Sequence, residues 1–337
     1  MFRFYNLFLF FFVIAQAGPG TLPLKAQKKY IFTQPKMGSP FRIIIYGRDS
    51  AAIAQVADNA FKQVDTLNLL FSDYINNSEL SRLSAGSGTG QYVPVSAPML
   101  DILRRSLQAS RLSGGSFDIT VGPVVKRWRK ARKDQVFPDR AAIKAALRST
   151  GYRYIHLDTA RSAVWLEKKG MQLDLGGIGK GYAAQAALDY IRKAGYPAAM
   201  TDAGGDMALG DAPGGDKGWL IAINMPEQRD ALLPKMLQLH NCAVATSGDV
   251  YQYLTYKGKR YSHIIDPRTG MGVTFQRNVT VIAPEGATAD WLAKAGSILP
   301  LRKAFRLVNR IPGAEMLVTE LRKGKLFQKS SAGFYKN

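Results

Sequence analysis

The chain has 337 residues, 46% of them hydrophobic and 21% charged, which excludes a disordered or fibrous chain and indicates a globular protein with its own core. Its 46 lysine and arginine residues outnumber 25 acidic residues, for a formal net charge of +21. The basic runs lack the stacking aromatics of a nucleic-acid-binding module, so no nucleic-acid partner is expected. A solvated basic face is predicted instead, suited to anionic ligands or to peripheral contact with an anionic membrane surface.

The first 17 residues have the features of a cleaved signal peptide. Arg3 gives a positive start, residues 7–14 form an apolar run, and the segment from Ala15 to Ala17 resembles a cleavage site. The run is too short to span a bilayer, and an N-terminal anchor or a buried helix is the alternative interpretation. No cysteine follows the run, so a lipoprotein anchor is not expected. An exported, periplasmic protein is therefore predicted.

The first half of the remaining chain contains amphipathic helices. An apolar run at residues 41–47 predicts a strand, and the segment after it has apolar residues at helical spacing, with Ser50 as its N-cap. A second helix is expected to stop at Gly114 and Gly115. The polar stretch at residues 129–139 is expected to be an exposed loop. The helices are expected at residues 50–72, 96–115, 138–151 and 179–195.

The second half is richer in strands. A hairpin turn is expected near Lys257 and Gly258, and two further helices, one containing Asp290 and one at residues 301–309, precede a final strand pair. Strand-like runs occur at residues 162–167, 170–177, 196–205, 218–225, 242–248, 250–266, 278–284, 315–320 and 324–330.

This mixture of helices and hairpins predicts an α+β fold, a single domain on a largely antiparallel sheet with flanking helices. The domain is expected at residues 37–325, between a polar leader at residues 18–36 and a C-terminal tail at residues 326–337. Cys242 is the only cysteine, so the chain has no internal disulfide and depends on its packed core for stability. Its neighbours suggest a half-buried strand, where a structural thiol is expected rather than a nucleophile.

Four segments that combine glycines with acids are candidates for chemistry, and each also has an ordinary structural interpretation. In the first, residues 113–123, Asp118 follows an aromatic residue where a helix end and a strand start would give the same pattern. In the second, residues 173–182, a strand ends at Asp174 and a helix opens near Lys180. Free backbone N–H groups beside a lysine suit a phosphate group, and a tight strand-to-helix turn explains the segment equally well.

In the third segment, residues 201–210, Asp202 and Asp206 flank two glycines, which a tight turn also explains. The fourth segment, residues 261–270, places His263 near an acid and an arginine around a proline turn. A lone histidine in a strand is more often structural than catalytic, so the segment alone does not decide between the two roles.

The order of these segments along the chain resembles that of the ApbE-type flavin transferases. Eight motifs occur in that family's order and with roughly its spacing: MGSPF, SDYINNSELSRLS, SGGSFDITVGPVV, DLGGIGKGYAAQ, AGGDMALG, ATSG, HIIDPRTG and VIAPEGATADWLAKA. The resemblance covers about residues 30 to 320, and HIIDPRTG and GSFDITVGP are its most specific pieces.

What the resemblance implies is a FAD:protein FMN transferase, an exported flavoprotein enzyme that binds FAD and a magnesium ion. Such an enzyme moves the FMN half of FAD onto a threonine or serine hydroxyl of an acceptor protein and releases AMP. The acceptors are exported or membrane redox proteins. Breaking a pyrophosphate requires that its charge be neutralised while the hydroxyl is aligned for in-line attack.

The resemblance also assigns roles to single residues. His263 is expected to take the hydroxyl proton. Asp290 is expected to be catalytic and to bind the metal, with the carbonyl of Gly177 as a second ligand. Glu79 matches an acidic position of the family. The positions expected to bind FAD are Met37, Tyr74, Ser116, Phe117, Asp118, Asp174, Lys180 and Ile265.

Two positions depart from the family pattern. Lys294 stands where the family has a metal-binding threonine one turn after Asp290, and Gln185 stands where it usually has an acid. A protonated ammonium group cannot ligate a cation, but it can take the cation's place beside Asp290. An alternative function is therefore a FAD-binding relative that has lost transfer, with Lys294 in place of the magnesium ion. For Asp290 and Lys294, a plain surface ion pair at helical spacing is another interpretation. For the whole chain, a basic surface-binding protein without flavin is the remaining alternative.

Overall fold

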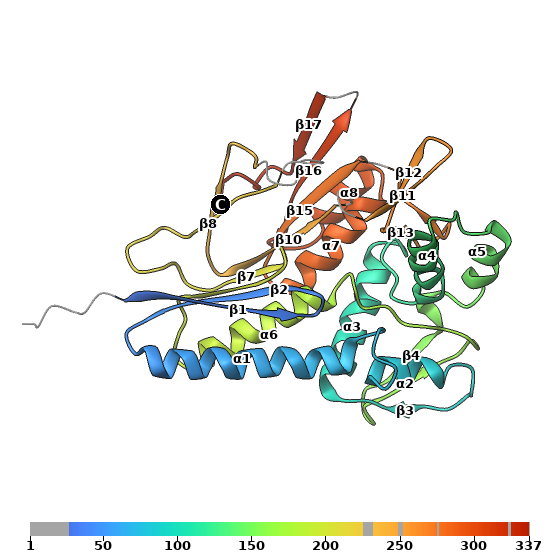
Figure 1. The fold of residues 1–337 in the computed structure, drawn as a ribbon, viewed down its shortest axis with the longest axis horizontal. Helices are drawn as coiled ribbons and strands as arrows, with labels where there is room; N and C mark the ends of the chain where they lie inside the picture. Colours follow the sequence, from blue (N-terminus) through green and yellow to red (C-terminus); the bar gives the residue numbers. More distant parts are fainter. Residues whose placement is uncertain (1–26, 225–231, 249–251, 275, 323–324, 337) are drawn as a thin grey trace, which may run out of the picture.

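The computed structural model describes residues 27–224, 232–248, 252–274, 276–322 and 325–336. At its centre is an eight-stranded sheet with the strand order β1-β2-β6-β7-β10-β15-β16-β17, in which every neighbouring pair is antiparallel (Figure 1). The predicted α+β fold on a largely antiparallel sheet is confirmed. The expected signal peptide lies outside the described residues.

The strands form this large sheet and several small ones. The large sheet contains β1 (Lys28–Lys36), β2 (Ser39–Gly47), β6 (Ala199–Ala203), β7 (Met207–Leu209), β10 (Cys242–Ser247), β15 (Arg277–Ala283), β16 (Glu315–Arg322) and β17 (Lys325–Ser330). The small sheets contain β3 (Val93–Pro94), β4 (Ile155–Asp158) and β5 (Ala163–Leu166), then β8 (Trp219–Ile221) with β9 (Leu237–Leu239), β11 (Tyr253–Tyr256) with β12 (Lys259–Ser262), and β13 (Ile265–Asp266) with β14 (Met271–Gly272).

The helices are grouped on one side of the large sheet and around its edge (Figure 1). They are α1 (Ser50–Phe71), α2 (Glu79–Ala85), α3 (Ala97–Leu112), α4 (Gly122–Asp134), α5 (Arg140–Leu147), α6 (Gly179–Lys193), α7 (Gly286–Ile298) and α8 (Leu301–Val308). Helices α6 and α7 pack directly on the sheet, and α1 packs against α6. None of the described helices is long and apolar enough to cross a membrane.

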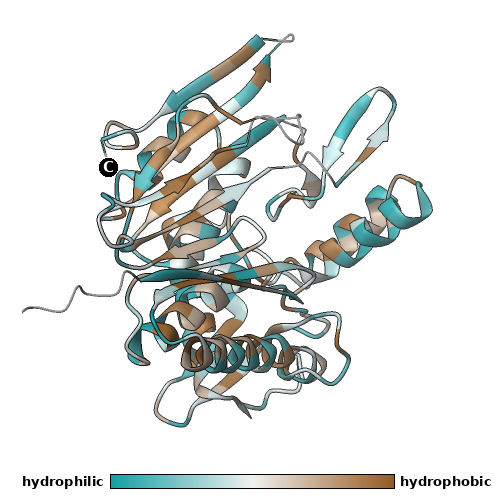
Figure 2. Ribbon diagram, turned by 60° about the vertical axis from the view of Figure 1, so that its left-hand side comes forward, coloured by the Kyte–Doolittle hydropathy of each residue, from teal (hydrophilic) through white to brown (hydrophobic). Residues whose placement is uncertain are grey.

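Side-chain alternation along the strands divides the core between the two faces of the sheet. In β10, Ala243 and Ala245 pack toward the helices, whereas Val244 packs on the opposite face with Phe334, which is fully buried. Cys242 packs on that same opposite face, and burial raises the pKa of its thiol to about 11. A thiol that stays protonated is a poor nucleophile, as expected for a structural cysteine. In Figure 2 the hydrophobic colour is concentrated along the sheet and the helices packed on it.

Several sequence expectations need correction. Helix α1 has its predicted range, but Asp49 caps it instead of Ser50, with its carboxylate accepting from the N–H groups of Ala51 and Ala52. The expected exposed loop at residues 129–139 is wrong in its first part, because α4 continues to Asp134. The strand expected at residues 170–177 is reduced to a single bridge.

The sheet also extends past both limits expected for the domain. Strand β1 starts at Lys28, inside the supposed leader, and pairs with β2 along its whole length. At the other end, β17 and the buried Phe334 belong to the fold, although residues 326–337 were expected to be a tail. Strand β1 lacked a clear signal because it is an exposed edge strand of polar composition, whereas β17 was expected as a strand at residues 324–330 and only its place inside the domain was missed.

Candidate functional site

Helices α6 and α7 begin at the same point in space, with their backbones in contact. A Cβ atom built on Gly181 would lie 2.1 Å from the carbonyl oxygen of Gly286, and one on Gly286 would lie equally close to the carbonyl of Gly181. The N–H of Gly181 also donates to Oδ2 of Asp290 at 3.2 Å. Only glycines allow this approach, which holds the first turns of the two helices side by side.

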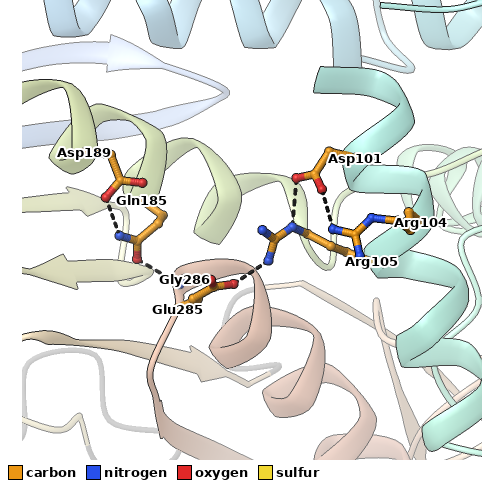
Figure 3. Close-up of polar contacts among 7 residues, drawn as sticks. All are labelled: Asp101, Arg104, Arg105, Gln185, Asp189, Glu285 and Gly286. Carbon is orange, nitrogen blue, oxygen red and sulfur yellow. Dashed lines mark hydrogen bonds and ion pairs between the residues drawn. The ribbon is translucent and has the colours of Figure 1, made fainter. Parts of the chain in front are cut away.

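Polar side chains fix the start of α7 from both neighbouring helices (Figure 3). From α6, Gln185 accepts a hydrogen bond from the N–H of Gly286 at 3.2 Å while its amide donates to Asp189 at 2.9 Å. From α3, Arg105 pairs with both Glu285 and Asp101. Gln185 therefore serves as a neutral cap for α7, with its amide oxygen accepting one hydrogen bond and its amide nitrogen donating another.

A small polar cavity of about 180 Å³ opens where these helix starts meet the end of β10. Three of its lining residues, Lys180, His263 and Asp290, were predicted to belong to the site. A fourth, Lys294, is the lysine that departs from the family pattern. The others are Gly176, Gly204, Asp206, Thr246, Ser247, Gly248 and Ala293. The structure thus joins segments from five distant parts of the sequence in one place.

Two carboxylates and two ammonium groups face this cavity. Burial, together with the neighbouring Asp290, raises the pKa of Asp206 well above its ordinary value, and the charges of Lys180 and Lys294 oppose the rise. Burial likewise raises the pKa of Asp290, against the influence of Lys294, the N–H of Gly181 and Lys180. The positive charges of Lys180 and Lys294 therefore reduce the electrostatic cost of placing two carboxylates close together.

Asp290 does not form the surface ion pair with Lys294 that helical spacing alone would suggest. Only 5% of its surface is exposed, and Lys294, one turn later, lines the cavity with it. Among the residues that the structure describes, neither Lys294 nor Lys180 has an ion-pair partner within 4.0 Å. Their ammonium groups therefore keep N–H donors available for an anion.

His263 lies at the cavity between β12 and β13, with its backbone N–H bonded to Gln252. Its Nδ1 is buried and has no hydrogen-bond partner in the described part of the chain. Burial, reinforced by the positive charges of Lys294, Arg132 and Lys180, lowers the pKa of the imidazole to about 3. The ring is therefore neutral at physiological pH and able to accept a proton.

This lowered pKa predicts an acid-sensitive fold. The unfolded histidine binds a proton near its ordinary pKa of 6.5 but the folded one does not, so stability falls as the pH drops through this range. We expect His263 to account for a loss of about 1–2 kcal/mol of unfolding free energy between pH 6.5 and about pH 5. Urea unfolding of wild type and His263→Gln at both pH values checks this. Equal losses in the two proteins would contradict it, since Asp206 and Asp290 are common to both.

Arg129 connects two other site segments, residues 72–84 and residues 173–182. Its guanidinium pairs with Asp73, donates to Oδ2 of Asp174 at 3.0 Å, and lies 4.2 Å from the ring centroid of Tyr74. Burial and Asp73 raise the pKa of Asp174, and Arg129 opposes that rise. Tyr74 is 75% exposed, so one face of its ring is covered by Arg129 while much of the side chain stays open to a ligand. Arg129 was not predicted, because it lies in a basic run that looked solvated.

Other residues predicted to bind FAD surround the cavity without lining it. Ser116 is fully buried, and its hydroxyl has no partner among the described residues. Phe117 packs beside Trp291 of α7, with ring centroids 6.2 Å apart, and touches the position above Gly177. Met37 stands at the β1–β2 turn with a positive φ of 50°, near the start of α6.

The remaining predicted residues have structural contacts of their own. The carboxylate of Asp118 accepts hydrogen bonds from the N–H and hydroxyl of Thr120 and from the N–H of Tyr152. These bonds use the carboxylate to connect the segment around Asp118 to the segment around Tyr152. Glu79 accepts from the N–H and hydroxyl of Ser96 at the start of α3. Ile265 is buried in a cluster with Trp128 of α4.

Sequence reasoning missed Asp206, Ser247 and Arg132 as site residues. Asp206 was noted beside two glycines, and a turn explained it equally well. The buried hydroxyl of Ser247 lines the cavity without a partner in the described part of the structure, and the sequence marked only the ATSG motif that contains it. The positive charge of Arg132 in α4 contributes to the lowered pKa of His263. Sequence alone could not distinguish this arginine from the other basic residues of the helix.

Family and sequence comparisons agree with this geometry. Residues 37–318 match the model of the ApbE family. A relative from Klebsiella pneumoniae (strain 342), named FAD:protein FMN transferase, is 31% identical over 278 residues, which are 81% of this chain and 79% of the relative. A relative of the same name from Escherichia coli (strain K12) is 28% identical over 315 residues, covering 92% of this chain and 90% of its own.

Solved structures give the same picture. The flavin transferase ApbE from Vibrio cholerae superposes with a TM-score of 0.81 at 26% identity, over 91% of this chain and 98% of its own. The ApbE protein from Thermotoga maritima gives a TM-score of 0.82 at 27% identity, over 92% of this chain and 100% of its own. The similarity therefore extends over at least 91% of this chain and at least 98% of both solved structures.

Proposed function

The chain belongs to the ApbE family, and we propose that it is a FAD:protein FMN transferase. The observation that carries this proposal is the polar cavity, which joins two lysines that have no ion-pair partner among the described residues, two carboxylates and a neutral histidine at the start of two helices. The positive charges of the two lysines suit a pyrophosphate. A proton acceptor in the same cavity suits an attacking hydroxyl.

In the proposed reaction, the acceptor's threonine or serine oxygen attacks the phosphorus on the FMN side of the pyrophosphate. A new P–O bond forms as the bond to the bridging oxygen breaks, and AMP leaves with that oxygen. The hydroxyl proton passes to His263. Lys180 and Lys294 balance the charge that develops on the phosphate oxygens. No electrons are exchanged, so the flavin keeps its redox state.

His263 gains basicity when the substrate is bound. The charges of Lys294, Arg132 and Lys180 help to lower its pKa, and an anionic pyrophosphate beside those cations offsets their effect. Binding of FAD therefore raises the pKa of the imidazole toward its ordinary range at the moment when a proton acceptor is needed.

The rest of FAD is proposed to extend from the cavity over the turn at Gly177. We place the isoalloxazine between the exposed ring of Tyr74 and the wall formed by Phe117 and Met37, since aromatic faces suit a flat heterocycle. Arg129 and Asp174 lie beneath Tyr74 and hold it in position.

A resident magnesium ion does not fit the residues present. Its expected ligands were Asp290 and the Gly177 carbonyl, but the Lys294 side chain lies 3.3 Å from the position of a Cβ on Gly177 and enters the same cavity. Within the described residues, no group of three or more His, Cys, Asp or Glu is arranged to hold a metal. In the proposed reaction Lys180 and Lys294 therefore supply the positive charge at the pyrophosphate.

Our inference of a compartment and an acceptor rests on the family resemblance and the sequence. We propose that the protein works in the periplasm and modifies a subunit of an exported or membrane redox system. A second hollow of about 480 Å³, lined by Lys126, Arg127 and Lys130 of α4, gives a basic surface suited to an anionic membrane or an acidic protein face. It holds no histidine or acid, so the chemistry is assigned to the smaller cavity.

Transfer is tested directly with an acceptor domain that the Klebsiella pneumoniae relative modifies. We expect the purified protein, incubated with FAD and this domain, to add the mass of FMN to the domain and to release AMP in equal amount. Intact-mass spectrometry and chromatography of the nucleotides measure both products. An acceptor in which the target hydroxyl is replaced by alanine is the control. FAD binding without either product would favour the relative that has lost transfer, which the transferase names of the related proteins do not support.

A further inference from the structure

Lys294 occupies the part of the site where a cation is needed. It follows Asp290 by one helical turn on α7, and its side chain crosses the glycine turn before α6. Its Cγ and Cε atoms lie 3.3 Å and 3.5 Å from the position that a Cβ would take on Gly177. The aliphatic stem therefore covers Gly177, and the ammonium end enters the cavity shared with Asp206 and Asp290.

The surroundings are those of a bound cation. The charge of Lys294 acts on Asp174, Asp206 and Asp290, three carboxylates from three separate parts of the chain. Asp290 is in turn fixed by the N–H of Gly181. An entering divalent ion would have to displace the ammonium group from this position or remain beside it, and both cost electrostatic energy.

We propose that Lys294 is a built-in substitute for the divalent cation, so that this protein binds FAD without metal. The proposal rests on the transferase function and specifies how this chain neutralises the pyrophosphate. Lys294 and Lys180 together bring two positive charges to the cavity, the charge of one magnesium ion. As hydrogen-bond donors they contact the phosphate oxygens directly, and the charges of Asp206 and Asp290 favour the presence of both ammonium groups in the cavity.

The test is the affinity of the purified protein for FAD, measured by isothermal titration in EDTA and again in magnesium chloride. We expect the same affinity in both. Lys294→Met, which keeps the stem and removes the charge, should lower the affinity by about 10- to 100-fold in either buffer, the loss of one charge-assisted hydrogen bond. Lys294→Thr should also bind weakly in EDTA and regain affinity in magnesium, because a hydroxyl beside Asp290 can ligate a hard cation.

Lys303→Thr on the neighbouring helix α8 removes an exposed lysine and is the matched control, with unchanged affinity in both buffers. Thermal unfolding shows whether each variant is folded. Tighter FAD binding by wild type in magnesium than in EDTA would overturn the proposal, as would full affinity in Lys294→Met. FAD binding that depends on magnesium would leave the transferase function standing, whereas absence of FAD binding in every buffer would remove both.

Discussion

Replacing His263 with alanine should lower the rate of FMN transfer by about 100-fold or more, the usual contribution of a general base, and leave FAD bound. The side chain is neutral, lines the cavity, and has no partner for Nδ1 among the described residues, so the imidazole is available to the acceptor hydroxyl. Alanine removes the proton acceptor but leaves Lys180 and Lys294 to hold the pyrophosphate. Single-turnover transfer and FAD titration measure the two effects separately.

His240→Ala is the matched control for this variant. His240 is exposed and lies in the loop after β9, away from the cavity, so its removal should change neither transfer nor binding. If His263→Ala transfers FMN at the wild-type rate, the histidine is structural. If it loses FAD as well as activity, the imidazole is a wall of the binding pocket rather than a base.

Gly181→Ala should destabilise the protein by about 3 kcal/mol or more, enough to leave it poorly folded, because overpacking at a backbone contact has no easy relief. The new methyl group would sit 2.1 Å from the carbonyl oxygen of Gly286 and 2.9 Å from Cβ of Asp290. The gain in helix propensity, about 1 kcal/mol, is too small to compensate. Urea unfolding monitored by circular dichroism gives the change in unfolding free energy.

Gly179→Ala, two residues earlier in the same helix, separates this contact from a general effect of alanine. Its Cβ would meet Leu175 at 3.8 Å and Met37 at 3.9 Å, which are ordinary packing distances. We expect a change within about 1 kcal/mol, the size of the propensity difference. Comparable losses in the two variants would show that the close approach of α6 and α7 is not what makes Gly181 necessary.

The sequence predicted elements well where one side of a helix or strand is apolar and the other polar. Helix α1 has that pattern through its length, from Ile53 to Phe71, and its range was predicted within a residue. Helix α4 was missed because basic residues surround its few apolar positions, although Trp128 is fully buried and donates to the carbonyl of Gly270. In a helix as highly charged as α4, the overall composition does not show that one face is buried.

The cavity could be predicted only in part, since most of its contacts join residues far apart in the chain. The motif order brought Lys180, His263 and Asp290 to attention. The contact of Lys294 with Gly177 depends on how α7 crosses the start of α6, and that crossing depends on two glycines with no visible partner in the sequence. Local spacing suggested an ordinary surface pair for Asp290 and Lys294, and tertiary packing placed both inside.

The exposure of Tyr74 has a consequence for turnover. After transfer, the FMN is covalently bound to the acceptor protein, and its isoalloxazine must leave the binding site while it is attached to that protein. A pocket that enclosed the ring on all sides would have to open widely for every product molecule. One aromatic face contributes only about 0.5–1.5 kcal/mol, and Arg129 anchors the tyrosine rather than the flavin. A binding site whose Tyr74 side is open to solvent lets the product dissociate quickly, so release need not limit the rate of repeated transfer.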